Sequence, residues 1–316
     1  MSSITLKMTA EAIQSLADHY PQAKIEKVPH AYYRLRINGT IITAYHSGKV
    51  LFQGSRAEEE AHKWQSSDQI ESSHLKKSPP SKPKPTNHYQ GLNLIGSDEV
   101  GNGSYFGALT VCAVYLNQTQ IQTLKDLGIQ DSKNLTDAKI QSLSRQIQDQ
   151  VCFHLTIINP NKYNQLTQKY NANAIKAIAH NYTLNACYQK LSTKDQKELD
   201  GALIDQFTPE RNYYQHLEKQ GQSIYPGKTF FAKKAESLHL SVACASIIAR
   251  DYFLQSLEKL GAPYNCVLPS GASQSVDQMA AQLIRDYGPE ALEKTAKLHF
   301  ANTQKALRLA GQSMKK

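Results

Sequence analysis

Residues 92–107 read LNLIGSDEVGNGSYFG and run directly into a second apolar segment. Two short apolar runs separated by glycines predict a hairpin of two buried strands. Asp98 and Glu99 stand where the first of these strands ends. Because neighbouring side chains on a strand point to opposite faces, both acids can serve one site only if the backbone bends there. Gly101 and Gly103 would permit such a bend.

Burying two carboxylates beside such apolar strands is costly unless a cation offsets their charge, although a solvated turn with two acids would explain the stretch equally well. Two further acids stand in similar places. Asp205 lies near the end of an apolar strand, and Glu236 lies between another strand and an almost wholly apolar helix. Strand ends in an α/β sheet can converge on one cleft. We therefore expect Asp98, Glu99, Asp205 and Glu236 to form a magnesium or manganese site, with two ions about 4 Å apart.

The 316-residue chain carries a formal net charge of +9, which favours a polyanionic partner, nucleic acid ahead of an anionic membrane surface. It has no apolar run near the roughly 20 residues that span a bilayer, and its N-terminus has no signal-peptide pattern. Its five cysteines are far apart and mostly in apolar surroundings, as in proteins of a reduced compartment. We expect a cytoplasmic protein and, because no oligomer signal is evident, a monomer.

Composition divides the chain into three parts. Residues 1–65 predict a small α+β domain with a helix capped by Thr9, three antiparallel strands with a turn at Asn38-Gly39, and a closing helix. Residues 66–89 are rich in proline, lysine and serine and have too few apolar residues to fold, so they predict a linker. Residues 90–316 form the larger domain.

The first strand of the small domain alternates between two kinds of side chain. One face is apolar, and the other presents Tyr32, Arg34 and Arg36. Aromatic and cationic side chains on one sheet face suit stacking on bases and contact with phosphates, while an ordinary solvated face is an equally good interpretation. Trp64, the only tryptophan, is expected to pack on the small core.

Three residues of the larger domain are less specific candidates. Ser132 and Lys133 precede a helix that Thr136 would cap, and they could contact phosphate or be ordinary loop residues. His239 lies close to Glu236, but a single histidine at a strand–helix junction is more often structural than a metal ligand.

Helical periodicity predicts the cover of the larger sheet. A helix over residues 171–191 should bury the side that carries Ile178 and Tyr182. A last helix over residues 291–309 carries several basic residues, among them Lys297.

These segments resemble, in order, the motifs of the type 2 ribonucleases H. The matching stretches are GSDEVGNG at 96–103 with FG at 106–107, DSK at 131–133, IDQF at 204–207, and KAES at 234–237 leading into SVACASIIAR at 241–250. Together they extend over nearly all of the chain from residue 91 to about residue 300.

Two departures from the ribonuclease HII pattern point to its sister family, ribonuclease HIII. Asn102 stands where the HII pattern has Arg, and Glu236 stands where it has Asp. The N-terminal module is also similar to the TATA-box-binding-protein-like domain that ribonuclease HIII carries. The chain is therefore identified as a member of the ribonuclease HIII family.

The resemblance implies an α/β fold: an RNase H-like catalytic domain with a mixed sheet flanked by helices, plus the small α+β N-terminal domain. It implies endonucleolytic cutting of the RNA strand of RNA/DNA hybrids, which leaves 5′-phosphate and 3′-hydroxyl ends. By the family pattern, Asp98, Glu99, Asp205 and Glu236 are catalytic and hold or position the metal ions.

The resemblance also implies how substrate is bound. The backbone from Gly101 to Gly103, helped by Asn102, would contact the ribose 2′-hydroxyls that distinguish RNA from DNA. The small domain would supply most of the hybrid affinity, with a steep salt dependence. Two alternatives remain open, namely an HII-like enzyme that acts at single embedded ribonucleotides and a non-catalytic hybrid-binding protein with structural acids.

Overall fold

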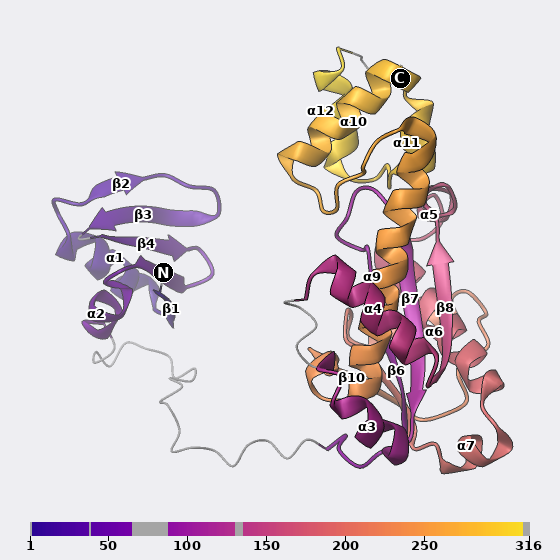
Figure 1. Cartoon of the computed structure of the whole chain (residues 1–316). Coiled ribbons are helices and arrows are strands. Elements are labelled where there is room, and N and C mark those ends of the chain that lie inside the picture. The colour runs from indigo at the N-terminus through magenta and orange to yellow at the C-terminus, as the bar shows by residue number, and fades with distance from the viewer. Residues whose placement is uncertain (1, 38, 65–87, 130–134, 312–316) are drawn as a thin grey trace. The chain divides into compact units, whose positions relative to one another are not determined.

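The computed structural model describes residues 2–37, 39–64, 88–129 and 135–311 (Figure 1). The chain divides into two compact units, Met1–Thr86 and Asn87–Lys316, each with its own hydrophobic core. Within the described ranges, no helix is both long enough and apolar enough to cross a membrane.

The N-terminal unit is an antiparallel sheet covered by two helices. Its strands lie in the order β1-β5-β4-β3-β2. The elements along the chain are β1 (Ser2–Lys7), α1 (Ala10–His19), β2 (Lys24–Glu26), β3 (Ala31–Ile37), β4 (Thr40–Tyr45), β5 (Lys49–Gly54) and α2 (Ala57–His62). The predicted helices and three central strands are present. The edge strands β1 and β2 were not predicted. β2 is only three residues long, whereas in β1 the alternation of Ile4 and Leu6 with exposed polar residues was an available signal.

Alternation in β3 sorts its side chains as the sequence indicates. Tyr33 and Leu35 are buried in a core that also contains Trp64, while Tyr32 and Arg36 are exposed. The α1 helix begins after Thr9, whose side chain accepts a hydrogen bond from the backbone N–H of Ala12. The core therefore lies between the helices and one face of the sheet, which leaves the other face of β3 to solvent.

The larger unit is built on a mixed sheet with strand order β10-β9-β6-β7-β8. The strands are β6 (Leu94–Val100), β7 (Leu109–Leu116), β8 (Cys152–Ile158), β9 (Gly201–Asp205) and β10 (Thr229–Ala232). β6, β7 and β8 are antiparallel neighbours, whereas β9 and β10 run parallel to β6. The mixed sheet confirms the predicted fold class.

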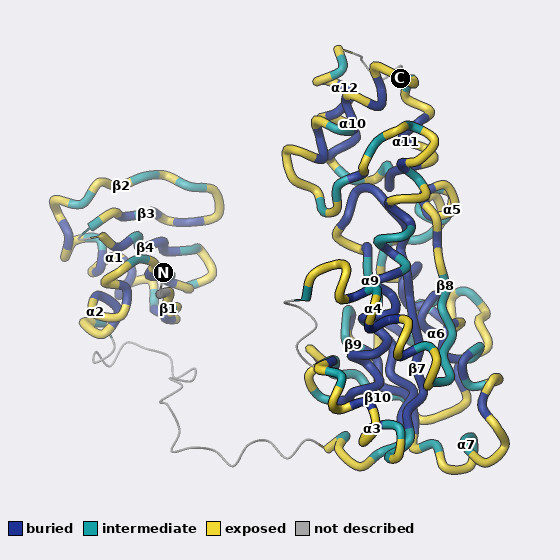
Figure 2. Tube along the Cα trace, in the orientation of Figure 1, coloured by how far each residue is buried: buried dark blue, intermediate teal, exposed yellow. Residues whose placement is uncertain are grey.

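Helices cover both faces of this sheet. On one face lie α9 (Leu240–Gly261), α4 (Asp137–Gln148) and α3 (Gln118–Lys125), and on the other lie α6 (Ala172–Lys190) and α8 (Glu210–Glu218). The remaining helices are α5 (Pro160–Thr167), α7 (Thr193–Glu198), α10 (Gln274–Tyr287), α11 (Glu290–Thr295) and α12 (Ala301–Leu309). Figure 2 shows that β6, β7 and much of α9 are buried.

Strict alternation along β6 assigns each side chain to one helical layer. Leu94 packs with Val242 of α9, while Ile95 packs into the core formed with α6. Gly96 faces α9 so closely that a Cβ atom there would lie 2.3 Å from the backbone N of Val242. The absence of a side chain at residue 96 is therefore what lets α9 lie directly on the strand that carries Asp98.

Two sequence predictions about the helices are wrong. Tyr182 lies on the solvent side of α6 and is 57% exposed, because the buried side of that helix includes polar residues and is rotated from the apolar pattern. The single helix predicted over residues 291–309 is two helices, α11 and α12. Between them the backbone of Ala296 is extended and forms an isolated bridge with Phe106.

Candidate active site

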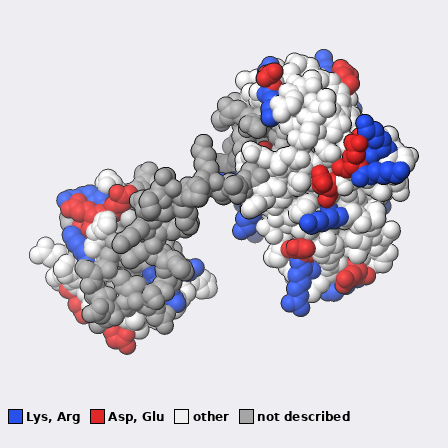
Figure 3. Space-filling view, turned by 90° about the horizontal axis from the view of Figure 1, so that it is seen from below, with Lys and Arg blue, Asp and Glu red and all other residues white. Residues whose placement is uncertain are grey.

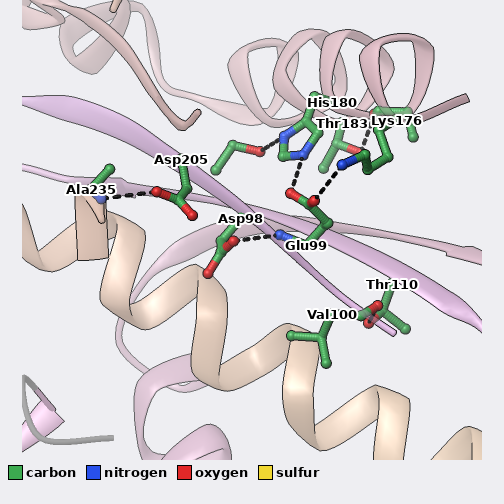
Figure 4. Close-up of polar contacts among 11 residues, drawn as sticks. Asp98, Glu99, Val100, Thr110, Lys176, His180, Thr183, Asp205 and Ala235 are labelled. Carbon is green, nitrogen blue, oxygen red and sulfur yellow. Dashed lines mark hydrogen bonds and ion pairs between the residues drawn. The ribbon is translucent and has the colours of Figure 1, made fainter. Parts of the chain in front are cut away.

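The strand β6 places Asp98 and Glu99 on opposite faces of the sheet. Its pairing with β7 continues without a bulge through Asp98, Glu99 and Val100. The bend that would bring both acids to one side is therefore absent. Figure 4 shows Glu99 turned toward α6, whereas Asp98 lies on the α9 side of the strand.

A buried polar network holds Glu99 against α6. Lys176 and His180 are one helical turn apart, and both side chains are buried. Lys176 Nζ lies 3.2 Å from Glu99 Oε1, and His180 Nε2 lies 3.0 Å from Oε2. The other ring nitrogen of His180 lies 2.7 Å from Ser97 Oγ. Because a carboxylate can only accept, Nε2 must carry a proton, which fixes the ring orientation.

This network keeps Glu99 ionised. Burial alone would raise the pKa of the Glu99 carboxyl, but hydrogen bonds and positive charge from His180 and Lys176 outweigh it and lower the pKa below its usual range. The ring of Phe207 completes the enclosure, with Lys176 Nζ 4.3 Å above its centroid and His180 stacked on it at 5.1 Å. Glu99 is thus a fixed negative charge next to Asp98 in the chain, on the α6 side of the sheet (Figure 4).

Asp98 has the opposite electrostatic character. Its side chain is 8% exposed, and no ion pair joins it to any described residue. Burial, followed by the charges of Glu99 and Asp205, raises the pKa of Asp98 to about 7, against a smaller lowering by a hydrogen bond with Ser246 of α9. Without a cation, this carboxylate is costly to ionise.

Asp205 ends strand β9, and Glu236 follows shortly after the end of the neighbouring strand β10. Asp205 is the last residue of β9, which is parallel to β6, and its Oδ1 accepts a hydrogen bond from the backbone N–H of Ala235 at 3.0 Å. The chain turns there through Lys234, which has a left-handed conformation with φ of 57°. A one-turn 3-10 helix, Ala235–Ser237, follows and carries Glu236. Figure 4 shows Asp205 near Asp98.

These side chains provide the oxygen donors that a magnesium or manganese ion requires. In the described part of the chain, no three His, Cys, Asp or Glu side chains lie close enough together to hold a metal ion among themselves. Magnesium sites in nucleases need no such cage, since one or two carboxylates, waters and substrate phosphate oxygens complete the coordination. The buried Asp98 carboxylate, whose pKa is raised by burial and by the charge of Glu99, fits such an open site.

His239 has a structural role, as its position indicated. The ring caps α9, with Nδ1 2.7 Å from Ser241 Oγ and accepting from the Ser241 backbone N–H, and Nε2 lies 3.2 Å from the carbonyl oxygen of Leu92. Burial lowers the pKa of His239, partly offset by the bond to that carbonyl. Both ring nitrogens are engaged within the fold.

The glycine-rich turn after β6 presents a short exposed tip. Gly101 has φ of +95°, and a Cβ atom there would lie 2.1 Å from the carbonyl oxygen of Ala108. Asn102 and Gly103 are exposed, and nothing lies within 4 Å of where a Cβ of Gly103 would be. The packing of the fold therefore does not require a glycine at residue 103. Without a side chain there, a ligand can approach the backbone closely.

The other predicted substrate-binding residues fall in two places. On the N-terminal unit, the half-exposed ring of Tyr32 lies edge-on to His46 and borders a cavity of about 370 Å³. On the same strand, Arg34 bonds to Thr43 and Arg36 pairs with Glu26. Ser132 and Lys133 lie outside the described residues. On the face shown in Figure 3, basic and acidic side chains of the larger unit are interspersed.

The residues that support the acids were not predicted from the sequence. Lys176 and His180 lie within an apolar helical pattern, where a polar residue pair four positions apart was the available signal. Lys297, interpreted as a basic residue on a helix, is instead fully buried beneath the glycine-rich turn. Neither the Lys176–His180 pair nor Lys297 belongs to a recognisable sequence motif.

Comparisons with known proteins agree with this architecture. A family model described as Ribonuclease HII matches residues 95–303, and one described as a domain of unknown function (DUF3378) matches residues 3–78. A protein named Ribonuclease HIII from Enterococcus faecalis is 41% identical over 306 residues, covering 96% of this chain and 98% of that protein. Another of that name, from Bacillus mycoides, is 41% identical over 312 residues, covering 98% of each.

Solved structures show the same relationship. The crystal structure of Bst-RNase HIII in complex with Mn2+ aligns with a TM-score of 0.69 and 36% identity, over 98% of this chain and 99% of that chain. The structure of Aquifex aeolicus RNase H3 aligns with a TM-score of 0.53 at 22% identity, which shows a shared fold.

Proposed function

This chain belongs to the ribonuclease HIII family, and we propose that its buried acids hold the metal ions with which it cuts the RNA strand of RNA/DNA hybrids. The chain is an endonuclease of such hybrids and depends on a divalent metal, magnesium or manganese. The observation that carries the site assignment is the buried Asp98 carboxylate, which has Asp205 beside it and no cationic partner among the described residues.

Asp98, Asp205 and Glu236 would hold the ions at the edge of the sheet. Divalent ions bound there would supply polarisation of the scissile phosphate and a lowered pKa for an attacking water, which suits in-line displacement with 5′-phosphate and 3′-hydroxyl products. The protein's share is to keep the carboxylates in place. The Ala235 N–H orients Asp205, and α9 packs against the strand that carries Asp98.

Glu99 is proposed to act from the opposite face of the sheet. Its carboxylate is held by Lys176 and His180, and its charge contributes to the raised pKa of Asp98. A carboxylate with a negative neighbour gains more from a cation than an isolated one would. Glu99 would therefore strengthen metal binding at Asp98 without contacting the ions in this arrangement.

The exposed tip at Asn102 and Gly103 is proposed to contact the ribose 2′-hydroxyls of the RNA strand. The open space at Gly103 supports backbone contact, and the Asn102 side chain offers both a donor and an acceptor. Asn102 is shorter than the Arg of ribonuclease HII, so we expect weak cutting at a single ribonucleotide in a DNA duplex. Assaying that duplex against a long hybrid separates the two specificities.

The test of the metal site is Asp98→Asn, assayed on a hybrid with magnesium and with manganese. Loss of cleavage with retained hybrid binding supports the assignment. Cleavage that survives the change in either metal would show that the acids are structural and that the metal site lies elsewhere.

The N-terminal unit is proposed to supply most of the affinity for the hybrid. The exposed Tyr32 beside a cavity and the basic side chains of the same strand suit stacking and phosphate contact. Deleting residues 1–65 should weaken hybrid binding while cleavage persists at high enzyme concentration, and unchanged affinity would exclude this role. We further propose that the protein acts as a monomer in the cytoplasm, which sedimentation and fractionation would test.

A further inference from the structure

Lys297 is the most unusual buried group outside the acids. Its side chain is 0% exposed, although the residue lies in the short segment between α11 and α12. The ammonium donates to two consecutive backbone carbonyls, those of Phe106 at 3.5 Å and of Gly107 at a shorter distance. The backbone N–H of Lys297 also donates to the carbonyl of Tyr105 at 2.8 Å. One residue thus contacts three successive peptide units.

No carboxylate balances this buried amine within the described ranges. Burial alone lowers the pKa of Lys297 to about 7, and the ring of Tyr163 has its centroid 6.0 Å from Nζ. Burying an amine is costly compared with burying a methionine of similar length. A methionine would fill the core equally well at lower cost, so packing alone does not explain why a lysine is buried here.

The peptide units that Lys297 holds form the base of the glycine-rich turn. Consecutive carbonyls of an extended chain point in opposite directions, and both can reach one ammonium only where the chain bends. Gly107 provides that bend with φ of +85°. Other contacts fix the same base: Gly107 N–H donates to the carbonyl of Thr295, and Ser104 Oγ donates to the carbonyl of Phe106. Only Asn102 and Gly103 remain exposed.

We propose that Lys297 is a positioning residue that holds the 101–107 turn in the shape in which it recognises RNA. This inference rests on the proposed ribose contact at Asn102 and Gly103. The ammonium fixes the direction of two peptide planes at the base of the turn, and so the direction of the tip that the ribose meets. A methionine would fill the same volume but would release both carbonyls, and the tip would sample other orientations.

Binding of two duplexes of one sequence tests the proposal, one an RNA/DNA hybrid and the other all DNA. Fluorescence anisotropy in EDTA measures binding by the full chain without cleavage. Lys297→Met should weaken hybrid binding about tenfold, with DNA-duplex binding within twofold of the parent. In steady-state cleavage the same change should raise KM more than it lowers kcat. A change in neither affinity, or an equal loss in both, would overturn the positioning role.

Two further variants keep the test decisive. Ser104→Ala removes another tether of the same turn and should shift the hybrid-to-DNA affinity ratio in the same direction, so it serves if Lys297→Met does not fold. Leu124→Ala creates a cavity in the α3 core, away from the turn, and should lower stability without changing the ratio. A ratio that falls in Leu124→Ala as far as in Lys297→Met would reduce the effect to lost stability and overturn the inference.

Asn102→Ala separates this inference from the proposed function. If it lowers the affinity ratio and the Lys297 and Ser104 variants do not, the turn recognises ribose but Lys297 does not position it. If all three variants leave the ratio unchanged, the ribose contact itself is wrong, and the inference fails with it.

Discussion

The buried pair of Lys176 and Glu99 leads to a quantitative prediction. The two side chains are 6% and 10% exposed, and their charged atoms are 3.2 Å apart. At that distance and an effective dielectric of about 20, Coulomb's law gives an attraction of about 5 kcal/mol. Replacing Lys176 with Met leaves Glu99 buried with only the hydrogen bond to His180. We expect the free energy of unfolding of the larger unit to fall by about 3 kcal/mol, the lower end for breaking a buried pair.

Glu99→Gln should cost a similar amount by leaving Lys176 as an uncompensated buried cation. The double variant buries neither charge, so its loss should be at least about 2 kcal/mol smaller than the sum of the single losses. Urea unfolding followed by far-ultraviolet circular dichroism gives these values for the larger unit. Trp64 is the only tryptophan and lies in the N-terminal unit, so its fluorescence midpoint should stay constant as an internal control. Single losses that add to within about 0.5 kcal/mol would refute the buried-pair argument.

The remaining predictions concern the metal site, the close approach of α9, and the N-terminal face. The folded-state pKa of Asp98, about 7, lies above its ordinary value of 3.8, so ionisation destabilises the metal-free protein, and stability should fall as the pH rises between these values. Asp98→Asn should therefore raise the midpoint of thermal unfolding measured in EDTA at pH 8, and a lower midpoint would contradict this. In a separate assay with metal, the same variant should not cleave the hybrid. For the same reason, Mn2+ must displace a proton below pH 7, and calorimetry should find its affinity rising about tenfold per pH unit and levelling off above pH 7. Gly96→Ala would place a Cβ 2.3 Å from the backbone N of Val242, and we expect it to cost about 3 kcal/mol or to prevent folding, as urea unfolding would show. Arg36→Ala should weaken hybrid binding at low salt and reduce the slope of log affinity against log salt by about one, whereas an unchanged slope would place Arg36 outside the interface.

Much of the framework was predictable from the sequence because its signals are local. Glycines flanking two apolar runs indicated the β6–β7 hairpin, and the side-chain alternation of β3 was visible in its residue types. The positions of Asp98, Asp205 and Glu236 at strand ends followed from the apolar runs before or after them. Whether those acids and Glu99 together hold metal stays a prediction.

What could not be predicted depends on contacts between distant segments. The residues around Glu99 in the sequence do not indicate that Lys176 and His180 contact it, because both lie on a helix about 80 residues further along the chain. At the break between α11 and α12, Ala296 pairs with Phe106, which lies far away in the sequence. Local propensity favours a continuous helix there, and tertiary pairing overrides it.

The α9 helix links the two ends of the proposed site. Ser246 bonds to Asp98, while Phe253 lies 2.9 Å from where a Cβ of Gly101 would be and Ser256 accepts a bond from the backbone N–H of Ala108. Seven residues of helix separate Ser246 from Phe253, which is about 10 Å at 1.5 Å per residue. The rise of α9 per residue therefore fixes the distance between its contact with Asp98 and its contacts with the glycine-rich turn. If the proposed metal site and the proposed ribose contact are correct, helix geometry sets the spacing between them. A hybrid in contact with both would then be cut at a constant offset from the ribose that the turn contacts.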